Sequence, residues 1–216
     1  MRNTSGMDPW TTIEAERLDL ADLLDGLTPE QWATPSLCGA WTVAEVATHL
    51  TSGPATTLPG VLTAMLQARG RFDVANQILV TRRMDRPRSM IGADLRRYAA
   101  DRFTPPTLDW HAPLTDLLVH RLDITHPLGL EGGGDPESWS EALGFLITRK
   151  ATMGFLPKGL PALTFVADDI GWSAGSGPRV EGPAEALALA ITRRPVRLDE
   201  LSGPGADTLR EWAARG

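Results

Sequence analysis

Hydrophobic and polar positions in the first two-thirds of the chain repeat with the period of an α-helix. Leu18, Ala21 and Leu24 recur at three-residue spacing, which places them on one face of a helix. Thr11 and Glu14 have the spacing of a capping box, so the first helix is predicted to begin at Thr11. Further helices are predicted to begin at Thr28 and Thr42 and to cover residues 61–68, 72–98, 113–125 and 138–153.

The pattern changes after residue 160, where the apolar runs become short and are separated by turn residues. A mainly α fold is therefore predicted, with a helical domain over residues 1–155 and a small α+β domain over residues 156–216. The glycine-rich residues 129–136 are expected to form a flexible connector. In the second domain, strands are predicted at 163–167, 170–173, 179–181 and 196–199, and helices at 183–191 and 206–214.

The charge balance narrows the class of partner. Asp and Glu number 27 against 21 Lys and Arg, and this acidic balance disfavours a broad nucleic-acid surface. No apolar run approaches the roughly 18 residues that cross a bilayer, and the N-terminus has no apolar signal region. The single cysteine, Cys38, excludes an intrachain disulfide. We therefore expect a cytoplasmic protein that binds neither membrane nor nucleic acid.

Three polar residues share one face of the helix predicted before Pro127. Asp116, His120 and Asp123 lie one turn apart in succession, and a carboxylate and an imidazole at i, i+4 can bind one cation. A complete site needs a ligand from elsewhere, and His49, at the edge of an apolar helix face, is the best candidate. The sequence thus predicts a divalent-metal site, with Zn²⁺ the first choice and Ni²⁺ or Fe²⁺ as alternatives.

The other candidate residues are predicted to have lesser roles. His126 points to another face of the same helix, and His111 lies in the loop before it. No general base is visibly arranged for Cys38, which argues against a nucleophilic role. Trp41 and Trp172 are expected to form walls of the cavity, with Trp41 in contact with the cofactor.

Seven short segments carry a family resemblance: Glu30–Trp32, Trp41–Leu50, Val119–Asp123, Asp169–Trp172, Gly175–Pro178, Val180–Pro183 and Leu201–Gly205. Taken in order, they resemble the mycothiol-dependent maleylpyruvate isomerase family, which belongs to the DinB-like bundles. The resemblance covers most of the chain and is weakest between residues 55 and 110. It implies an up-down four-helix bundle before the small α+β domain.

The resemblance also implies a role for each metal-site residue. The family's metal ligands are His, Glu and His, and His49 and His120 match the two histidines. Asp116 stands where the family has Glu, and its side chain is one methylene shorter. Asp123 matches a family aspartate, expected to orient a ligand or hold a metal-bound water.

The substrate-binding arginine is matched less closely. Arg193 most nearly corresponds to a C-terminal arginine that binds substrate carboxylate in the family. The glycine that precedes it there is Thr192 in this chain, and Arg194 is the alternative.

The implied chemistry is that of a metal-activated thiol. Because no suitable cysteine lies in these motifs, the thiol would be mycothiol, acting on a small electrophilic substrate as an S-transferase or a cis–trans isomerase. A homodimer is a further expectation. The alternative is a non-catalytic small-molecule binding or stress-response protein with an altered or lost metal site, and Asp116 in place of Glu is the sign that favours it.

Overall fold

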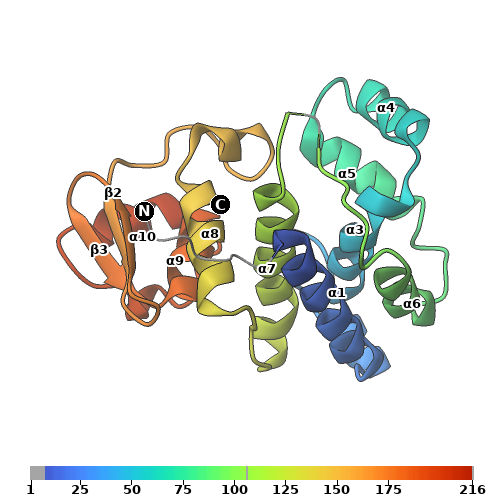
Figure 1. The fold of residues 1–216 in the computed structure, drawn as a ribbon, viewed down its shortest axis with the longest axis horizontal. Coiled ribbons are helices and arrows are strands. Elements are labelled where there is room, and N and C mark those ends of the chain that lie inside the picture. The colour runs from blue at the N-terminus through green and yellow to red at the C-terminus, as the bar shows by residue number, and fades with distance from the viewer. Residues whose placement is uncertain (1–7, 106, 216) are drawn as a thin grey trace.

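Four helices form a bundle in the first part of the chain, as the computed structural model, which describes residues 8–105 and 107–215, shows (Figure 1). Helix α1 packs on α6 and α7, and α3 packs on the same two helices. Helices α4 and α5 pair with each other beside α3. The helices of this part are α1 (Pro9–Asp25), α2 (Pro29–Trp32), α3 (Val43–Ala55), α4 (Leu58–Gln67), α5 (Phe72–Thr81), α6 (Ser89–Arg97) and α7 (His111–Thr125).

A three-stranded sheet forms the other end of the molecule (Figure 1). Strand β1 lies in the centre, antiparallel to β2 and parallel to β3, and α9 packs on the sheet and on α10. The predicted helical bundle followed by a small α/β unit is confirmed. The remaining elements are η1 (His126–Leu128), α8 (Pro136–Leu146), η2 (Arg149–Met153), β1 (Thr164–Ala167), β2 (Trp172–Gly175), β3 (Arg179–Gly182), α9 (Ala184–Ile191), η3 (Leu198–Glu200) and α10 (Ala206–Ala213).

Helix α8 joins the bundle to the sheet. It packs on α7 on one side and on α9 on the other, and one cluster of buried apolar side chains extends from Ile13 to Ala213. The domain boundary near residue 155 stays a prediction. Within residues 8–105 and 107–215, no helix combines the length and the apolar composition needed to cross a bilayer.

The starts of α1, α2 and α3 follow local capping chemistry. Thr28 and Thr42 both form complete capping boxes, as their spacing predicts. Helix α1 begins two residues before the predicted start at Thr11, because the Asp8 side chain accepts from the backbone N–H of Trp10 and Pro9 occupies the first turn.

The predicted long helix over residues 72–98 is wrong, because the segment forms two helices. Pro87 disfavours helical backbone at the residue before it, and the chain turns between α5 and α6. Asp94 is only 5% exposed and forms ion pairs with Arg83 and Arg86. These two arginines therefore tie the turn to α6 and do not belong to a solvated face.

The predicted strand at 196–199 is also wrong. Arg197 has a φ of 55°, a left-handed conformation that interrupts extended backbone, and η3 follows it. Its guanidinium binds Glu185 on α9 and Glu200 on η3. These ion pairs hold the turn against α9.

The glycine-rich connector of residues 129–136 packs against α7 and α8. Trp139 donates its indole N–H to the carbonyl of Gly133 at 2.9 Å, and Arg121 on α7 donates to the carbonyl of Gly132. The middle of the connector is thus held by one side chain from α7 and one from α8, contrary to the flexible segment that its composition predicts.

Gly134→Ala is expected to lower the free energy of unfolding by about 1–3 kcal/mol. Gly134 has a φ of 82°, and an added Cβ would lie 2.8 Å from the side chains of Leu118 and Trp139. The matched control is Gly144→Ala within α8, where no heavy atom lies within 4 Å and alanine should stabilise the helix by up to about 1 kcal/mol. Urea unfolding of both variants measures the difference; equal effects would contradict this packing.

Candidate metal centre

Two adjacent helices bring three candidate ligands together. Helix α3 carries His49, and α7 carries Asp116 and His120 one turn apart. Because α3 packs directly on α7, the imidazole rings of His49 and His120 come within 4.9 Å of each other, measured between centroids. The ligand atoms of the three residues all lie within 4.8 Å of one another.

The separations between these atoms fit a cation. His49 Nε2 lies 3.5 Å from Asp116 Oδ2, and His120 Nε2 lies 3.5 Å from Asp116 Oδ1. Both separations are longer than the roughly 2.7–3.2 Å of an N–H···O hydrogen bond. Two atoms that each lie about 2.1 Å from a tetrahedral cation are about 3.4 Å apart. Each carboxylate oxygen of Asp116 thus lies at about this separation from one of the two imidazoles.

His120 is held by a buried chain of charged groups. Its Nδ1 lies 2.8 Å from Asp123 Oδ2, and Asp123, which is 0% exposed, accepts from Nε and Nη2 of Arg194 at 2.8 and 2.7 Å. Metal-binding histidines are usually oriented by a carboxylate on the second ring nitrogen. With Nδ1 bonded to Asp123, His120 Nε2 is the ring nitrogen that faces Asp116.

The charged groups of the cluster shift one another's pKa values. Burial alone would raise the pKa of Asp116, but the imidazoles of His120 and His49 hold this pKa well below its ordinary value. Burial would lower the pKa of His120, but Asp116 and a bond to Asp123 raise it well above its ordinary value. Burial would likewise raise the pKa of Asp123, and Arg194 lowers it to about 2. In the absence of a metal, the protonated ring of His120 and the guanidinium of Arg194 therefore balance the two carboxylates, and a bound cation would replace the proton of His120.

His49 lies against the ring of Trp41. Its Nδ1 is buried and has no hydrogen-bond partner among the described residues. The Trp41 ring lies 5.3 Å from the His49 ring, and the Trp41 indole N–H donates to Gln77 on α5. Trp41 therefore forms a wall beside the predicted ligands.

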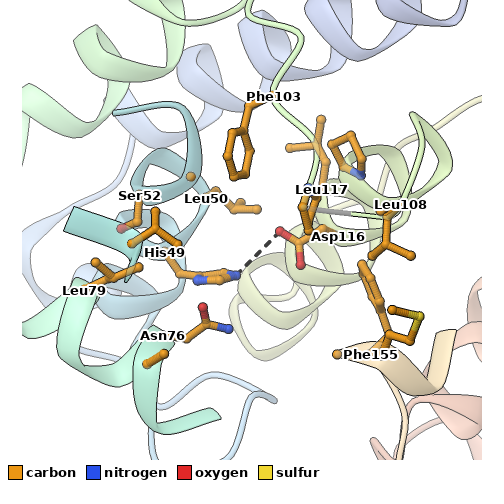
Figure 2. Close-up of a pocket in the computed structure, with 18 of the residues that line it drawn as sticks. His49, Leu50, Ser52, Asn76, Leu79, Phe103, Leu108, Asp116, Leu117 and Phe155 are labelled. Carbon is orange, nitrogen blue, oxygen red and sulfur yellow. Dashed lines mark ion pairs between the residues drawn. The ribbon is translucent and has the colours of Figure 1, made fainter. Parts of the chain in front are cut away.

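Two cavities meet at the cluster, and His49 and Asp116 line both. The first, here called the apolar chamber, has a volume of about 190 Å³. Figure 2 shows His49 and Asp116 pointing toward one another in this chamber, below Phe103 and beside Leu79. The second, the outer groove, has a volume of about 610 Å³ and is lined by Trp41, Gln77, His120 and Arg194 among others.

The structure does not bring Arg193 to the site. Its backbone adopts a φ of 61° after α9, and its guanidinium stacks 4.1 Å above the ring of Trp212. Arg194, the alternative, lines the outer groove. Trp172 lies on β2 and lines neither cavity.

Cys38 lies closer to the site than the sequence indicated. Its sulfur, His120 and Asp123 offer ligand atoms within 4.8 Å of one another, and Cys38 lines the outer groove. The loop that carries it is held by a bond from the Cys38 N–H to Ser36. The only sequence signal was the position of this loop directly before α3.

Part of the helical bundle is similar to a known domain family. Residues 13–105 match the family model described as the mycothiol maleylpyruvate isomerase N-terminal domain. The matched residues make up less than half of the chain, and they are similar to this domain family. The resemblance that the motifs carry is thereby confirmed. The matched residues include Trp41 and His49, and they end before α7.

Two solved structures of mycothiol-dependent maleylpyruvate isomerase are similar to the chain. One is a crystal structure of that enzyme with 16% identity and a TM-score of 0.49; the other is a histidine-to-alanine mutant with 15% identity and a TM-score of 0.48. Each alignment covers 93% of this chain and 97% of the other. The likeness to the family rests on the domain match. No curated protein sequence matches the chain.

Proposed function

We propose that the chain is a divalent-metal-dependent enzyme that uses a low-molecular-weight thiol of the mycothiol type to act on a small electrophile. The observation that carries this proposal is the convergence of His49, Asp116 and His120 where the apolar chamber meets the outer groove. The family match supports it, because the family is named for a thiol-dependent isomerase.

The three converging side chains would hold the metal, with Zn²⁺ the first choice. When bound, such a cation lowers the pKa of a thiol and so supplies a nucleophilic sulfur at neutral pH, suited to cis–trans isomerisation or S-transfer. The chain's own contribution is orientation. Asp123 fixes the ring of His120, and Arg194 fixes Asp123 by two hydrogen bonds.

The outer groove is the proposed site for the thiol. It offers polar side chains from α5, including Asp73, Asn76 and Gln77, beside the ring of Trp41. Mycothiol carries many hydroxyl groups, and carboxylate and amide side chains bind hydroxyls by hydrogen bonds. The apolar chamber on the other side of His49 and Asp116 would then receive the electrophile.

Turnover is expected only when both metal and thiol are present. The test incubates zinc-loaded protein with mycothiol and a panel of activated alkenes and alkyl halides, and follows product by chromatography. Removing the metal with a chelator, or omitting the thiol, should lower the rate at least about 100-fold, since the nucleophile is then lost. If metal and mycothiol both bind and no electrophile is converted, the enzyme proposal fails and a binding module takes its place.

A further inference from the structure

We infer that Arg17 of α1 binds an acidic group of the electrophile, so that the substrate is a small organic anion held between Arg17 and the metal centre. This inference rests on the proposed function and names a binding residue for it. The arginine that the sequence leads us to expect in this role, Arg193 or Arg194, is replaced by a residue of the first helix of the bundle.

Arg17 is a buried cation at the wall of the apolar chamber. The residue is only 7% exposed, and it lines the chamber together with His49 and Asp116. Within residues 8–105 and 107–215, its hydrogen-bond partners are main-chain carbonyls and not carboxylates. Because buried charges in proteins are usually paired with an opposite charge, an anion that enters the chamber would supply the missing partner.

Only one of the three guanidinium nitrogens of Arg17 is engaged. Nη1 donates to the carbonyls of Tyr98, Ala99 and Asp101 at 2.7–3.1 Å, which occupies both of its N–H groups. Nε and Nη2 form no hydrogen bond with any residue that the structure describes. These two nitrogens share one edge of the guanidinium, and such an edge binds a carboxylate by two parallel hydrogen bonds.

Arg194 uses the same edge for a carboxylate in this molecule. Its Nε and Nη2 donate to the two oxygens of Asp123 at 2.8 and 2.7 Å, and its Nη1 donates to the carbonyl of Thr192. Arg17 has the corresponding carbonyl bonds at Nη1 and lacks the carboxylate. Because Arg194 is already paired with a carboxylate that is 0% exposed, Arg17 is the guanidinium that is available to a substrate.

Arg17 and the metal ligands lie on different sides of the chamber. The last carbonyl that Arg17 binds belongs to Asp101, and Phe103, two residues later, faces His49 and Asp116 across the chamber in Figure 2. Burial lowers the pKa of Arg17, and the negative charges of Asp101 and Asp116 act against this shift. The guanidinium is therefore within electrostatic reach of the metal ligand Asp116.

The size of the chamber suits one ring between these two sides. An apolar protein cavity of about 150 Å³ takes up benzene, and the chamber has a volume of about 190 Å³. The proposed thiol takes the position that three protein ligands leave open on a tetrahedral metal, which leaves the acidic group of the electrophile to Arg17. A small acid with its electrophilic carbon at the opposite end fits this arrangement.

Binding is tested with benzoate and benzamide, which share the ring and differ in charge. Calorimetry on the full-length protein at neutral pH, first without metal and then loaded with zinc, measures both ligands. We expect benzoate to bind at least about tenfold more tightly in both forms, because only the anion forms charge-assisted bonds with Arg17. A preference that appears only with zinc would assign the carboxylate to the metal and overturn the inference. Equal binding of the two ligands, or binding of neither, would overturn it as well.

Arg17→Gln should abolish the preference for benzoate in the metal-free protein and leave benzamide binding within about threefold of its native value. The matched control is Arg96→Gln. Arg96 also joins α6 to α1, through Asp22 and Asp25, but it lines neither cavity. This control should keep the full preference. An unchanged preference in Arg17→Gln, or an equal loss in both variants, would refute the role of Arg17.

A second measurement covers the case in which Arg17→Gln does not fold. Lysine keeps the charge and can donate to the carbonyls at the end of α6, but it lacks the edge with two nitrogens. Arg17→Lys should therefore weaken benzoate binding about tenfold. In nitrogen-labelled native protein, the Arg17 Nε–H resonance, identified by its absence from Arg17→Lys, should shift with benzoate and not with benzamide. A resonance that benzoate leaves in place would show that this edge is not the binding site.

Turnover is tested with para-(chloromethyl)benzoate and para-(chloromethyl)benzamide in the presence of zinc and mycothiol. The thiol loses its proton to solvent, the sulfur forms a bond to the benzylic carbon, and chloride leaves with the electron pair of the C–Cl bond. We expect Arg17→Gln to raise KM for the anion at least about tenfold with little change in kcat, and to leave KM for the amide unchanged.

The outcomes for binding and turnover separate the two proposals. Conversion of both halides that Arg17→Gln does not alter overturns the role of Arg17 and leaves the proposed function standing. Conversion of neither halide, with benzoate binding that depends on Arg17, supports the role of Arg17 and refutes turnover.

Discussion

His120→Ala is expected to abolish metal uptake, while the native protein binds about one divalent cation per chain. His120 supplies one of three converging ligands, and its Nε2 lies 3.5 Å from Asp116. Two remaining ligands do not make the three protein contacts of a catalytic zinc site. Metal analysis after dialysis against Zn²⁺ measures the loss, which we expect to exceed about 100-fold in affinity.

The matched control for this variant is His126→Ala. His126 is exposed, follows α7 directly, and belongs to neither group of potential ligands among the described residues. Its replacement should leave metal content unchanged, and helical circular dichroism should be the same in both variants. Normal metal binding by His120→Ala would show that the ligand assignment is wrong.

Asp123→Asn is expected to lower the free energy of unfolding of the metal-free protein by about 3 kcal/mol. Asp123 is 0% exposed and accepts two hydrogen bonds from Arg194, so the neutral amide leaves a buried guanidinium without its counter-charge. The same change should weaken metal affinity about 10–100-fold, because His120 loses the carboxylate that orients it. Urea unfolding and competition with a chelating dye measure the two effects.

A surface ion pair provides the control for Asp123→Asn. Asp207 pairs with Arg210 on α10, but its side chain is 90% exposed, and exposed pairs contribute little to stability. Asp207→Asn should therefore leave both the unfolding curve and the metal affinity unchanged. If Asp123→Asn behaves in the same way, the buried chain from Arg194 to His120 has no structural role.

The helical half of the fold could be predicted because its signals are local. The capping boxes at Thr28 and Thr42 depend on residues three apart, and they form as expected. The long helix over residues 72–98 was mispredicted because Pro87 and the pairing of Asp94 with two arginines outweigh the hydrophobic period. The strand predicted at residues 196–199 does not form, because Arg197 adopts a left-handed backbone conformation.

The sequence by itself determined the pair Asp116 and His120, because helical geometry alone places residues four apart on one face. Only the tertiary structure decided what surrounds this pair. It set His49 of α3 opposite Asp116, and it brought Arg194 to Asp123 across 71 positions of sequence.

The choice between Arg193 and Arg194 shows why contacts between residues far apart in the sequence cannot be predicted from local patterns. Arg193 has a left-handed backbone after α9, which turns two consecutive side chains in different directions. One stacks on Trp212 and the other enters the site. Which one does so depends on how α9 packs against α7 and α10. Spacing along the chain specifies a helix face, whereas packing specifies which faces meet.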